Sequence, residues 1–533
     1  MYNNYTPLQQ RQLALQEYSN TQSTYLLVCA PARSTALKST LTDQLHRKFR
    51  LVDRLGGELT ASVDGVLLAA EDVELMSTAL MYFAKALQDG ADYAVCNAVF
   101  GFGGATALYQ SQPLQAQNRC AVVSRTLLER CRAAAHDPEN VPELLALAAQ
   151  LCTRPALIPQ ALLHYERGIC AEDAFSAHGK RAFIMSHVLD MTGAPIVLVS
   201  AVPVLRSMGY EVLVLGPSDG GSLHLFLDAG ASVITRSSCR NVSDAWGMAL
   251  CADFVIVNTV VMARAVRALS GTAVPVLWWL HDAFAGYPHI AHQIPTQLGE
   301  NVRVYSVGNH AANAMRAVRP EFEIRPLIYG LPDYAAENFV RTDLGYNRGR
   351  PLFATVGSFE RRKGHDIFCK AIRLLPPEVR EKASFLFVGQ AADKEMMDSV
   401  RALTADYPEN VFYCKRLTRD EIKSLMEQCT GLVCASRDDP MPTFVTEGLI
   451  FGKPSIVSEH TGTAGLISEG RNGFVYHNDD PQQLAVLLEH AIEHPEELAS
   501  MRTECRKMYE QYYSKEAFEQ TLRAAVEDLT AKK

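Results

Sequence analysis

The chain has 533 residues, of which 48% are apolar and 21% charged, and it carries a net charge of −8 with a pI near 6.0. At roughly 150 residues per domain, this length predicts about three soluble globular domains. The acidic balance argues against a broad nucleic-acid-binding surface.

The cysteine pattern and the apolar pattern exclude two further classes. The 13 cysteines are odd in number, contain no Cys-x-x-Cys pair and include several inside apolar runs, such as Cys29 and Cys434. They predict reduced thiols in a cytoplasmic protein rather than disulfides or a zinc site. The polar start predicts no secretory signal, and the absence of about 18 consecutive apolar residues predicts no membrane span. Peripheral membrane contact stays open.

Residues 1–175 are predicted to form an auxiliary α/β region. A helical lead-in precedes apolar runs at 25–32, 64–87 and 91–100, and residues 136–142 have the composition of a loop. Docking, acceptor recognition and oligomer formation are the roles open to this region.

From residue 181, short apolar runs alternate with longer helical patterns. Continuous apolar runs are typical of strands buried on both faces, and the alternation indicates parallel βαβ units. A polar joint at 343–351 separates two sets, which predicts doubly wound domains at 176–345 and 346–533, with the last helices packing back on the first of these. The predicted strands are 183–187, 211–216, 232–236, 253–258, 274–281, 303–308, 352–357, 384–389, 411–414, 431–436, 454–458 and 473–476.

Ligands of such sheets bind outside the carboxyl ends of the strands. There the segment ASRDDPMPTFVTEG, residues 435–448, places two aspartates before a helix that begins near Thr443. The helix start can receive a diphosphate on its N–H groups. Glu447 can accept two hydrogen bonds from a ribose diol, and Asp439 can do the same for a sugar. The alternative is that both acids are solvated loop and helix-start residues, and that Asp438 or Asp439 simply caps the helix.

Other strand ends carry weaker signals. The cations Arg361, Arg362 and Lys363 could stabilise a diphosphate leaving group, or form an exposed basic helix start. His281 could face a ligand or be a structural histidine. Gly193 and Gly462 could allow close approach to a ligand or be ordinary turn glycines.

Together these segments resemble the family 4 retaining glycosyltransferases. The donor half of that family is matched by ATVGSFERRKGHDIFCKAI (354–372), FLFVGQ (385–390) and ASRDDPMPTFVTEGLIFGKPSIVSEHTGTAGLISEGRNGFVY (435–476). The acceptor half is matched by SHVLDMTGAPIVLVSAVPVLRSMGYEVLVLGP (186–217) and WWLHD (278–282). The resemblance implies the GT-B fold, in which two Rossmann-like doubly wound domains face each other, here preceded by the extra N-terminal α/β region.

The resemblance also implies residue roles. Glu447 would hold the ribose, Lys363 and Arg362 the diphosphate, Asp439 the sugar hydroxyls, and His281 the sugar near its anomeric carbon. The chain departs from the family at Ser358, where many members carry Arg, and at Asp439, where they carry Glu. The other implied donor-binding residues are Gly193, Ser358, Arg361, Gly389, Met441, Pro442, Thr443, Phe444, Val445 and Gly462.

The N-terminal region is similar to the latter part of a family 2 glycosyltransferase domain, through residues 64–100 and 118–131. The metal-binding Asp-x-Asp of that family falls on residues 69–72, which read Ala-Ala-Glu-Asp. We therefore expect no metal and no cofactor, with the nucleotide sugar as a substrate.

The predicted function is transfer of a sugar from a nucleotide-diphosphate-sugar to a glycan, lipid-linked or protein acceptor, with retention of configuration. Two alternatives are a GT-B nucleotide-sugar epimerase and a non-catalytic glycosyltransferase partner subunit. The acceptor-side motifs favour a transferase over the first alternative. The complete set at 281, 363, 439 and 447 argues against the second.

Overall fold

The structure is a computed structural model of the chain. It describes residues 23–29, 35–41, 44, 46–55, 62–70, 73–101, 106–110, 119–166, 179–236, 239–240 and 247–531. The predicted helical lead-in and the acids Glu71 and Asp72 lie outside these residues. Two compact units are present, Met1–Ile256 and Val257–Lys533.

The first unit begins with an α/β layer structure. Strand β1 lies between β2 and β3, parallel to both, and β7 pairs antiparallel with β3. Side chains alternate across β1, so Leu26 and Val28 face one apolar cluster while Leu27 and Cys29 face another. The elements are β1 (Leu26–Cys29), α2 (Thr35–Thr40), β2 (Phe49–Val52), β3 (Gly65–Ala69), β4 (Glu74–Leu75), α3 (Ala79–Gln88), β5 (Tyr93–Gly101), β6 (Thr106–Gln110), β7 (Cys120–Ser124), α4 (Arg125–Ala134), α5 (Val141–Leu151) and β8 (Pro155–Glu166).

A strand pairing joins this region to the rest of the first unit. Strand β6 runs antiparallel to β11, with Leu108 opposite Ile234, and β11, β10 and β9 follow in parallel order. This pairing could not be predicted from the sequence, because backbone hydrogen bonds between distant strands leave no local pattern. The elements are β9 (Lys180–Met185), α6 (Gly193–Ser207), β10 (Tyr210–Gly216), α7 (Leu223–Asp228), β11 (Ser232–Arg236), η4 (Gly247–Cys251) and β12 (Phe254–Asn258), which crosses the unit boundary.

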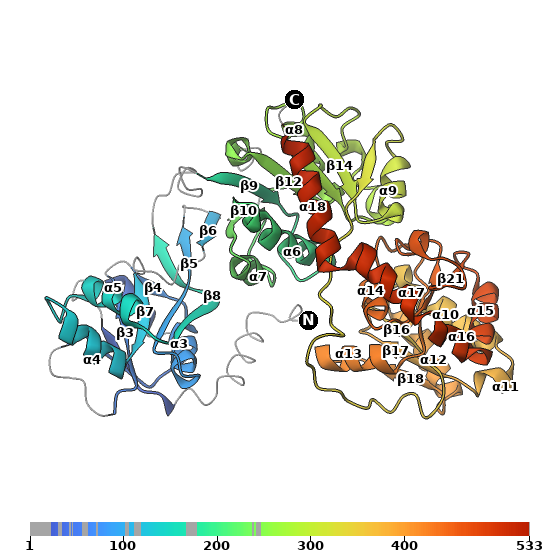
Figure 1. Cartoon of the computed structure of the whole chain (residues 1–533), viewed down its shortest axis with the longest axis horizontal. Coiled ribbons are helices and arrows are strands. Elements are labelled where there is room, and N and C mark those ends of the chain that lie inside the picture. The colour runs from blue at the N-terminus through green and yellow to red at the C-terminus, as the bar shows by residue number, and fades with distance from the viewer. Residues whose placement is uncertain are drawn as a thin grey trace. The chain divides into compact units, whose positions relative to one another are not determined.

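The second unit opens with three parallel strands, β13, β14 and β15. The ring of Trp279 in β13 is fully buried and stacks on Phe518 of the C-terminal helix α18, with ring centroids 5.8 Å apart. This contact packs α18 against β13. Figure 1 shows α18 as the red helix in the part of the second unit that contains β14. The elements are η5 (Val260–Met262), α8 (Ala263–Leu269), β13 (Val276–Leu280), η6 (Phe284–Gly286), η7 (Ala291–Gln293), β14 (Val302–Ser306), α9 (Asn309–Arg316) and β15 (Ile324–Pro326).

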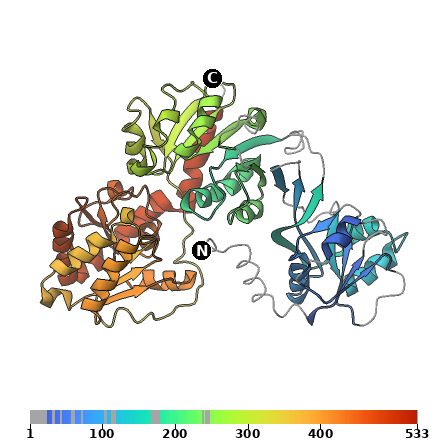
Figure 2. The ribbon, with the colours of Figure 1, turned by 180° about the vertical axis from the view of Figure 1, so that it is seen from behind.

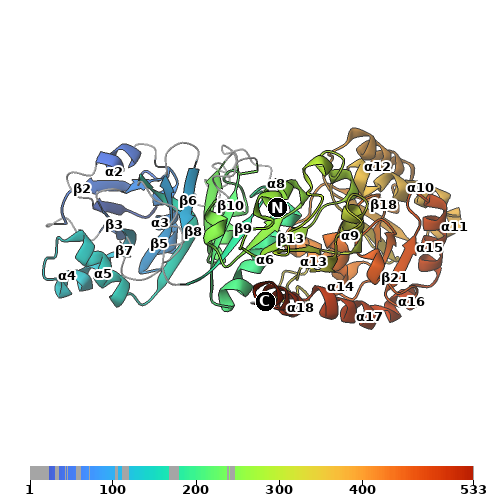
Figure 3. The ribbon, with the colours of Figure 1, turned by 90° about the horizontal axis from the view of Figure 1, so that it is seen from above.

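A six-stranded parallel sheet follows, in the order β18-β17-β16-β19-β20-β21. Helices cover both of its faces, with α10, α12 and α15 in one layer and α14 against α17 in the other (Figures 2 and 3). The strands are β16 (Leu352–Val356), β17 (Ser384–Val388), β18 (Val411–Cys414), β19 (Gly431–Cys434), β20 (Ser455–Ser458) and β21 (Gly473–Tyr476). The helices are η8 (Arg361–Lys363), α10 (His365–Leu374), α11 (Pro377–Arg380), α12 (Lys394–Asp406), α13 (Arg419–Gln428), α14 (Thr443–Ile450), η9 (Ala464–Leu466), α15 (Pro481–Glu493), α16 (Pro495–Ser500), α17 (Arg502–Met508), η10 (Tyr509–Tyr513) and α18 (Lys515–Thr530).

The strand order locates the binding edge of this sheet. The direction of winding reverses between β16 and β19, which lie side by side. Doubly wound sheets bind ligands at this reversal point, outside the carboxyl ends of the strands. A ligand site is therefore expected in the loops that follow these two strands, residues 357–364 and 435–442.

The predicted strands from residue 183 onward are confirmed, because each predicted run contains a strand with ends shifted by a few residues at most. One short strand, β15, was missed, since Ile324–Pro326 is too short and too polar to register as an apolar run. No helix among the described ranges is long and apolar enough to cross a membrane.

The α18 contact yields a stability prediction. Phe518 is 2% exposed, and Phe518→Ala should lower the free energy of unfolding of the second unit by about 3–5 kcal/mol, the cost of a deleted core ring. Urea unfolding is the measurement. Val486→Ala is the control, because Val486 on α15 is 64% exposed and its loss should change stability by no more than about 0.5 kcal/mol. Equal stability of the two variants would contradict the packing of α18.

Candidate functional site

The loop after β16 carries three consecutive cations in a fixed turn. Residues Arg361–Lys363 form the short helix η8, and Gly364 follows with a φ of +65°. A Cβ on Gly364 would lie 1.8 Å from the carbonyl oxygen of Ala435, so only glycine lets this loop touch the loop after β19. The turn therefore places its cations beside residues 435–442.

Arg437 holds this turn in place. Its guanidinium donates two hydrogen bonds of 2.8 Å to the carboxylate of Asp366 and one of 2.9 Å to the carbonyl of Arg361. Burial alone would raise the pKa of Asp366, but the hydrogen bonds from Arg437 hold it below its ordinary value. Arg437 was not predicted as a site residue, because no local pattern in the sequence indicates that its side chain contacts residue 366.

A buried ion pair connects the two loops. Lys363 Nζ lies 2.6 Å from Oδ2 of Asp439, and Asp439 is 3% exposed. Arg362 lies 3.9 Å from the same oxygen and donates to the carbonyl of Asp438 at 2.8 Å. The predicted carboxylate and the predicted cations thus meet at the reversal point of the sheet.

The loop after β20 supports Asp439 from the other side. The N–H of Asp439 donates to the carbonyl of His460 at 3.1 Å, and the N–H of Gly462 donates to the carbonyl of Asp439 at 2.9 Å. A Cβ on Gly462 would lie 1.7 Å from the carbonyl oxygen of Pro440. Glycine is therefore required at position 462 by the close approach of the Pro440 backbone.

Glu447 lies in the middle of α14 and is 8% exposed. Arg419, the first residue of α13, lies 3.1 Å from Oε1 of Glu447. Burial raises the pKa of Glu447, and the positive charge of Arg419 opposes that rise. Glu447 is therefore neither an exposed residue nor a helix cap.

His281 directly follows β13, and its ring lies 4.7 Å from the ring of Trp279. The next residue, Asp282, accepts a 2.6 Å hydrogen bond from the N–H of Val260. Burial raises the pKa of Asp282 to about 6, against the lowering effect of that hydrogen bond. Both residues thus stand at the carboxyl end of a strand, as the sequence predicted.

Asp438 ties the β13 end to the β19 end. Its carboxylate accepts hydrogen bonds from the N–H of Phe284 at 3.1 Å and of Ala285 at 2.8 Å, and lies 2.6 Å from Nε2 of His310. Burial would raise the pKa of Asp438, but the hydrogen bonds from His310 and the two N–H groups hold it below its ordinary value. The local pattern of the sequence suggests a cap role for Asp438 and does not point to His310.

The other predicted donor-binding residues lie in the loops after β16 and β17, at the start of α14 and, for Gly193, in the first unit. Ser358 donates to Glu360 at 3.2 Å, and Glu360 also pairs with Arg362 at 2.9 Å. Gly389, after β17, donates to the carbonyl of Cys414 at 3.0 Å. Met441, Pro442, Phe444 and Val445 are buried and Thr443 is exposed at the start of α14. Gly193 belongs to the first unit, where it begins α6 and a Cβ would have open space around it.

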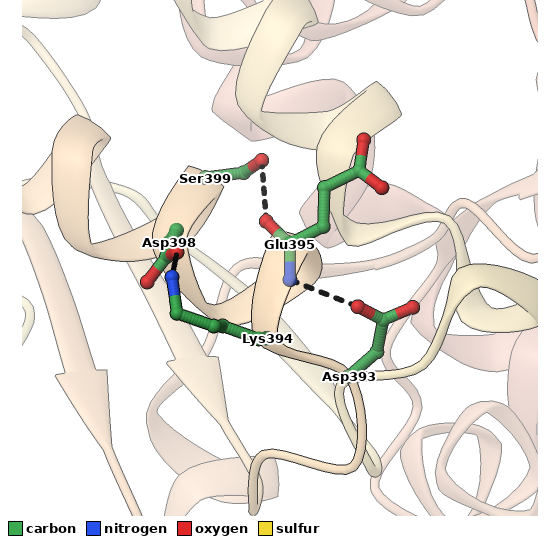
Figure 4. Close-up of a pocket in the computed structure, with 5 residues that line it drawn as sticks. All are labelled: Asp393, Lys394, Glu395, Asp398 and Ser399. Carbon is green, nitrogen blue, oxygen red and sulfur yellow. Dashed lines mark hydrogen bonds and ion pairs between the residues drawn. The ribbon is translucent and has the colours of Figure 1, made fainter.

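A separate pocket lies at the start of α12 (Figure 4). Its polar groups bind one another: Asp393 accepts from the N–H of Glu395 at 2.8 Å, Lys394 pairs with Asp398 at 2.5 Å, and Ser399 donates to the carbonyl of Glu395 at 2.9 Å. None of the predicted site residues lines it. Among the described residues, no group of three or more His, Cys, Asp or Glu side chains is arranged to hold a metal ion.

Two family models match the chain. One, described as glycosyl-transferase family 4, matches residues 178–313, and the other, described as glycosyl transferases group 1, matches residues 337–508. Together they match more than half of the chain and contain every predicted catalytic residue. The chain belongs to the family 4 glycosyltransferases. The resemblance noted in the sequence is thereby confirmed.

Curated relatives of this family 4 glycosyltransferase are distant. An uncharacterized glycosyltransferase of Methanocaldococcus jannaschii is 25% identical over 194 residues, which are 36% of this chain and 53% of that protein. Spore coat protein SA of Bacillus subtilis is 26% identical over 160 residues, which are 28% of this chain and 41% of that protein. The chain thus spans about half the length of the curated relatives it matches.

Solved structures confirm the GT-B fold. HepE of Anabaena in complex with UDP-glucose is 15% identical, with a TM-score of 0.53 over 66% of this chain and 100% of that one. Sucrose-phosphate synthase from Thermosynechococcus elongatus is 15% identical, with a TM-score of 0.53 over 66% of this chain and 99% of that one. The α/β class and the GT-B architecture predicted from the sequence are correct.

The contacts of Asp438 predict a measurable loss on substitution. Asp438→Ala leaves three donors without their shared acceptor and should lower the free energy of unfolding by about 2–3 kcal/mol or more. Amide hydrogen exchange at Phe284 and Ala285 should become faster. The control is Asp398→Ala, whose pair with Lys394 is exposed and should contribute less than about 1 kcal/mol. Unchanged exchange at both amides would show that Asp438 does not hold this loop.

Proposed function

We propose that the chain transfers a hexosyl group from a nucleoside diphosphate sugar to an acceptor hydroxyl, with retention of configuration. The observation that carries the proposal is the meeting of Lys363, Arg362 and Asp439 at the reversal point of the six-stranded sheet, beside the start of α14. The complexes of HepE with UDP and with UDP-glucose support the donor class.

Each part of the donor has a matching group. Glu447 would accept hydrogen bonds from the ribose hydroxyls, and Asp439 would accept them from the sugar. The N–H of Val445 already donates to the carbonyl of Pro442 at 3.1 Å, so the first-turn donors that α14 offers to a diphosphate are those of Thr443 and Phe444. Lys363 and Arg362 would supply the positive charge.

Donor binding would then change the partners of both Lys363 and Asp439. Without a donor, Lys363 neutralises the buried carboxylate of Asp439 at 2.6 Å. A diphosphate would attract Lys363, while the sugar hydroxyls would take its place as donors to Asp439. Because sugar hydroxyls carry no charge, Arg362, which lies 3.9 Å from the same oxygen, would be the cation that remains beside Asp439. This matters because an unpaired buried charge is strongly destabilising.

The chemical step requires no protein nucleophile. The bond from the anomeric carbon to the diphosphate oxygen breaks, and the acceptor oxygen bonds to that carbon from the same face. The acceptor proton goes to the leaving phosphate oxygen. Negative charge grows on the diphosphate as this happens, so Lys363 and Arg362 would stabilise the transition state more than the ground state. His281 would position the sugar near its anomeric carbon.

We further propose that the diphosphate is held without a metal ion, through Arg361, Arg362, Lys363 and the start of α14. The acceptor class includes glycans, lipid-linked acceptors and proteins, and the N-terminal region would serve docking, assembly or acceptor recognition. We also propose a cytoplasmic location, which buried free thiols such as that of Cys29 support.

A screen of nucleoside diphosphate sugars tests the proposal. A true donor should raise the melting temperature and should be hydrolysed slowly, with the released sugar keeping its anomeric configuration by NMR. Both effects should persist in excess chelator. Inversion of configuration would contradict the mechanism, and activity that is lost in chelator and restored by magnesium or manganese would contradict the metal-free site.

Substitution of Lys363 separates chemistry from binding. Lys363→Ala should lower kcat by about 10²-fold, the scale of a lost transition-state donor. Because this change also leaves Asp439 unpaired, the Lys363→Ala, Asp439→Asn double variant is measured beside it to restore charge balance in the fold. His281→Ala should lower kcat with little change in nucleotide affinity. A rise in KM alone for Lys363→Ala would assign the lysine to uniform binding.

A further inference from the structure

Arg419 contacts both the carboxylate of Glu447 and the ring of Tyr334. Its guanidinium Nη1 is 3.1 Å from Oε1 of Glu447, and its Cζ lies 4.1 Å from the ring centroid of Tyr334. The side chain of Glu447 is 11% exposed, whereas that of Arg419 is 53% exposed. The arginine thus covers the carboxylate from the solvent side.

The residues around Arg419 fix the position of its backbone. Thr418 caps α13, accepting from the N–H of Glu421, and the side chain of Glu421 accepts from the N–H of Thr418 at 2.6 Å. This capping box sets the backbone of Arg419, the first helical residue. The cation–π contact with Tyr334, which lies in the segment between the two sheets, sets the direction of its side chain.

Few other titratable groups face Glu447. The pKa values of Tyr334 and of the buried Tyr329 are both raised, first by burial and in smaller part by the charge of Glu447. On the opposite side of α14, Arg506 of α17 binds the carbonyl of Ile450 rather than Glu447. Arg419 is therefore the cation that compensates this carboxylate.

We propose that Arg419 is a positioning residue for donor binding: it keeps the carboxylate of Glu447 ionised and oriented for the ribose, and Tyr334 holds Arg419 in place. The inference rests on the proposed function, because it takes Glu447 as the ribose ligand. It does not require Arg419 to touch the donor.

The electrostatics give the sign of the effect. Burial raises the pKa of Glu447, and Arg419 lowers it. If the ribose needs the carboxylate, affinity is constant above that pKa and falls as the pH drops below it. Loss of the arginine removes the lowering contribution, so the fall begins at a higher pH. For each unit that the pKa rises, binding at the acidic end weakens by up to about tenfold.

The experiment measures the affinity of UDP and of ADP between about pH 5.5 and 8.5, a range that brackets a raised carboxyl pKa. The variants are Arg419→Gln, Arg419→Lys, Tyr334→Leu and Glu447→Gln. Arg341→Gln is the matched control, because Arg341 also stacks on a ring, Phe339 at 4.6 Å, and pairs with a carboxylate, Glu427 at 2.9 Å, outside the proposed site.

We expect the binding curve of Arg419→Gln to shift to higher pH, with Arg419→Lys close to wild type, Tyr334→Leu in between and Arg341→Gln unchanged. Glu447→Gln should bind weakly at every pH, and adding Arg419→Gln to it should change nothing further. A uniform loss of affinity across the whole range for Arg419→Gln, or no loss, would overturn the positioning role.

A second measurement separates this inference from the proposed function. The carboxyl carbon of Glu447, followed by NMR during a pH titration without ligand, should titrate at a higher pH in Arg419→Gln than in wild type. Failure of the wild type to bind any nucleoside diphosphate of the donors in the screen would overturn the proposed function, while this titration would still test the ion pair. An unchanged midpoint would overturn the inference itself.

Discussion

The buried pair of Lys363 and Asp439 is the constraint on which the rest of the site depends. A carboxylate that is 3% exposed cannot stay charged without a partner, and Lys363 Nζ supplies one at 2.6 Å. This single contact joins the loops that leave β16 and β19 at the point where the sheet reverses its winding. A donor that drew Lys363 away would leave Arg362, 3.9 Å from the same oxygen, as the remaining cation beside Asp439.

The ion pair can form only because the backbones approach closely. Gly364 lies against the carbonyl of Ala435, and Gly462 lies against the carbonyl of Pro440, at positions where a Cβ would overlap the carbonyl oxygen. Arg437 holds the turn of residues 361–364 in place through its hydrogen bonds to Asp366. Asp438 accepts hydrogen bonds from the N–H groups of residues 284 and 285, which follow β13. The ion pair, the two glycines and these hydrogen bonds therefore all fix the conformation of the loops that follow β13, β16, β19 and β20.

The carboxylates of Asp438, Asp439 and Glu447 differ in their hydrogen-bond partners, their ion pairs and the charges around them. Asp438 accepts three hydrogen bonds and has its pKa lowered, which suits a structural tie. Asp439 is held by a cation. Glu447 is buried with a raised pKa and a single arginine, so its charge state is the one most open to adjustment by its surroundings. Their neighbours in space, rather than their spacing along the chain, create these differences.

The sequence by itself determined the strands and their division into two doubly wound sets, because apolar periodicity is a local property. It also placed residues 361–363 and Asp439 at strand ends, which a doubly wound sheet brings to a shared edge. The GT-B architecture was implied by the resemblance to a known family. Only the tertiary structure decided which partners they have. The reach of Arg437 to Asp366, of Asp438 to His310 and of Arg419 to Glu447, and the pairing of β6 with β11, each join residues that are far apart in the chain. Such contacts follow from the packing of whole elements, and no short stretch of sequence contains that information.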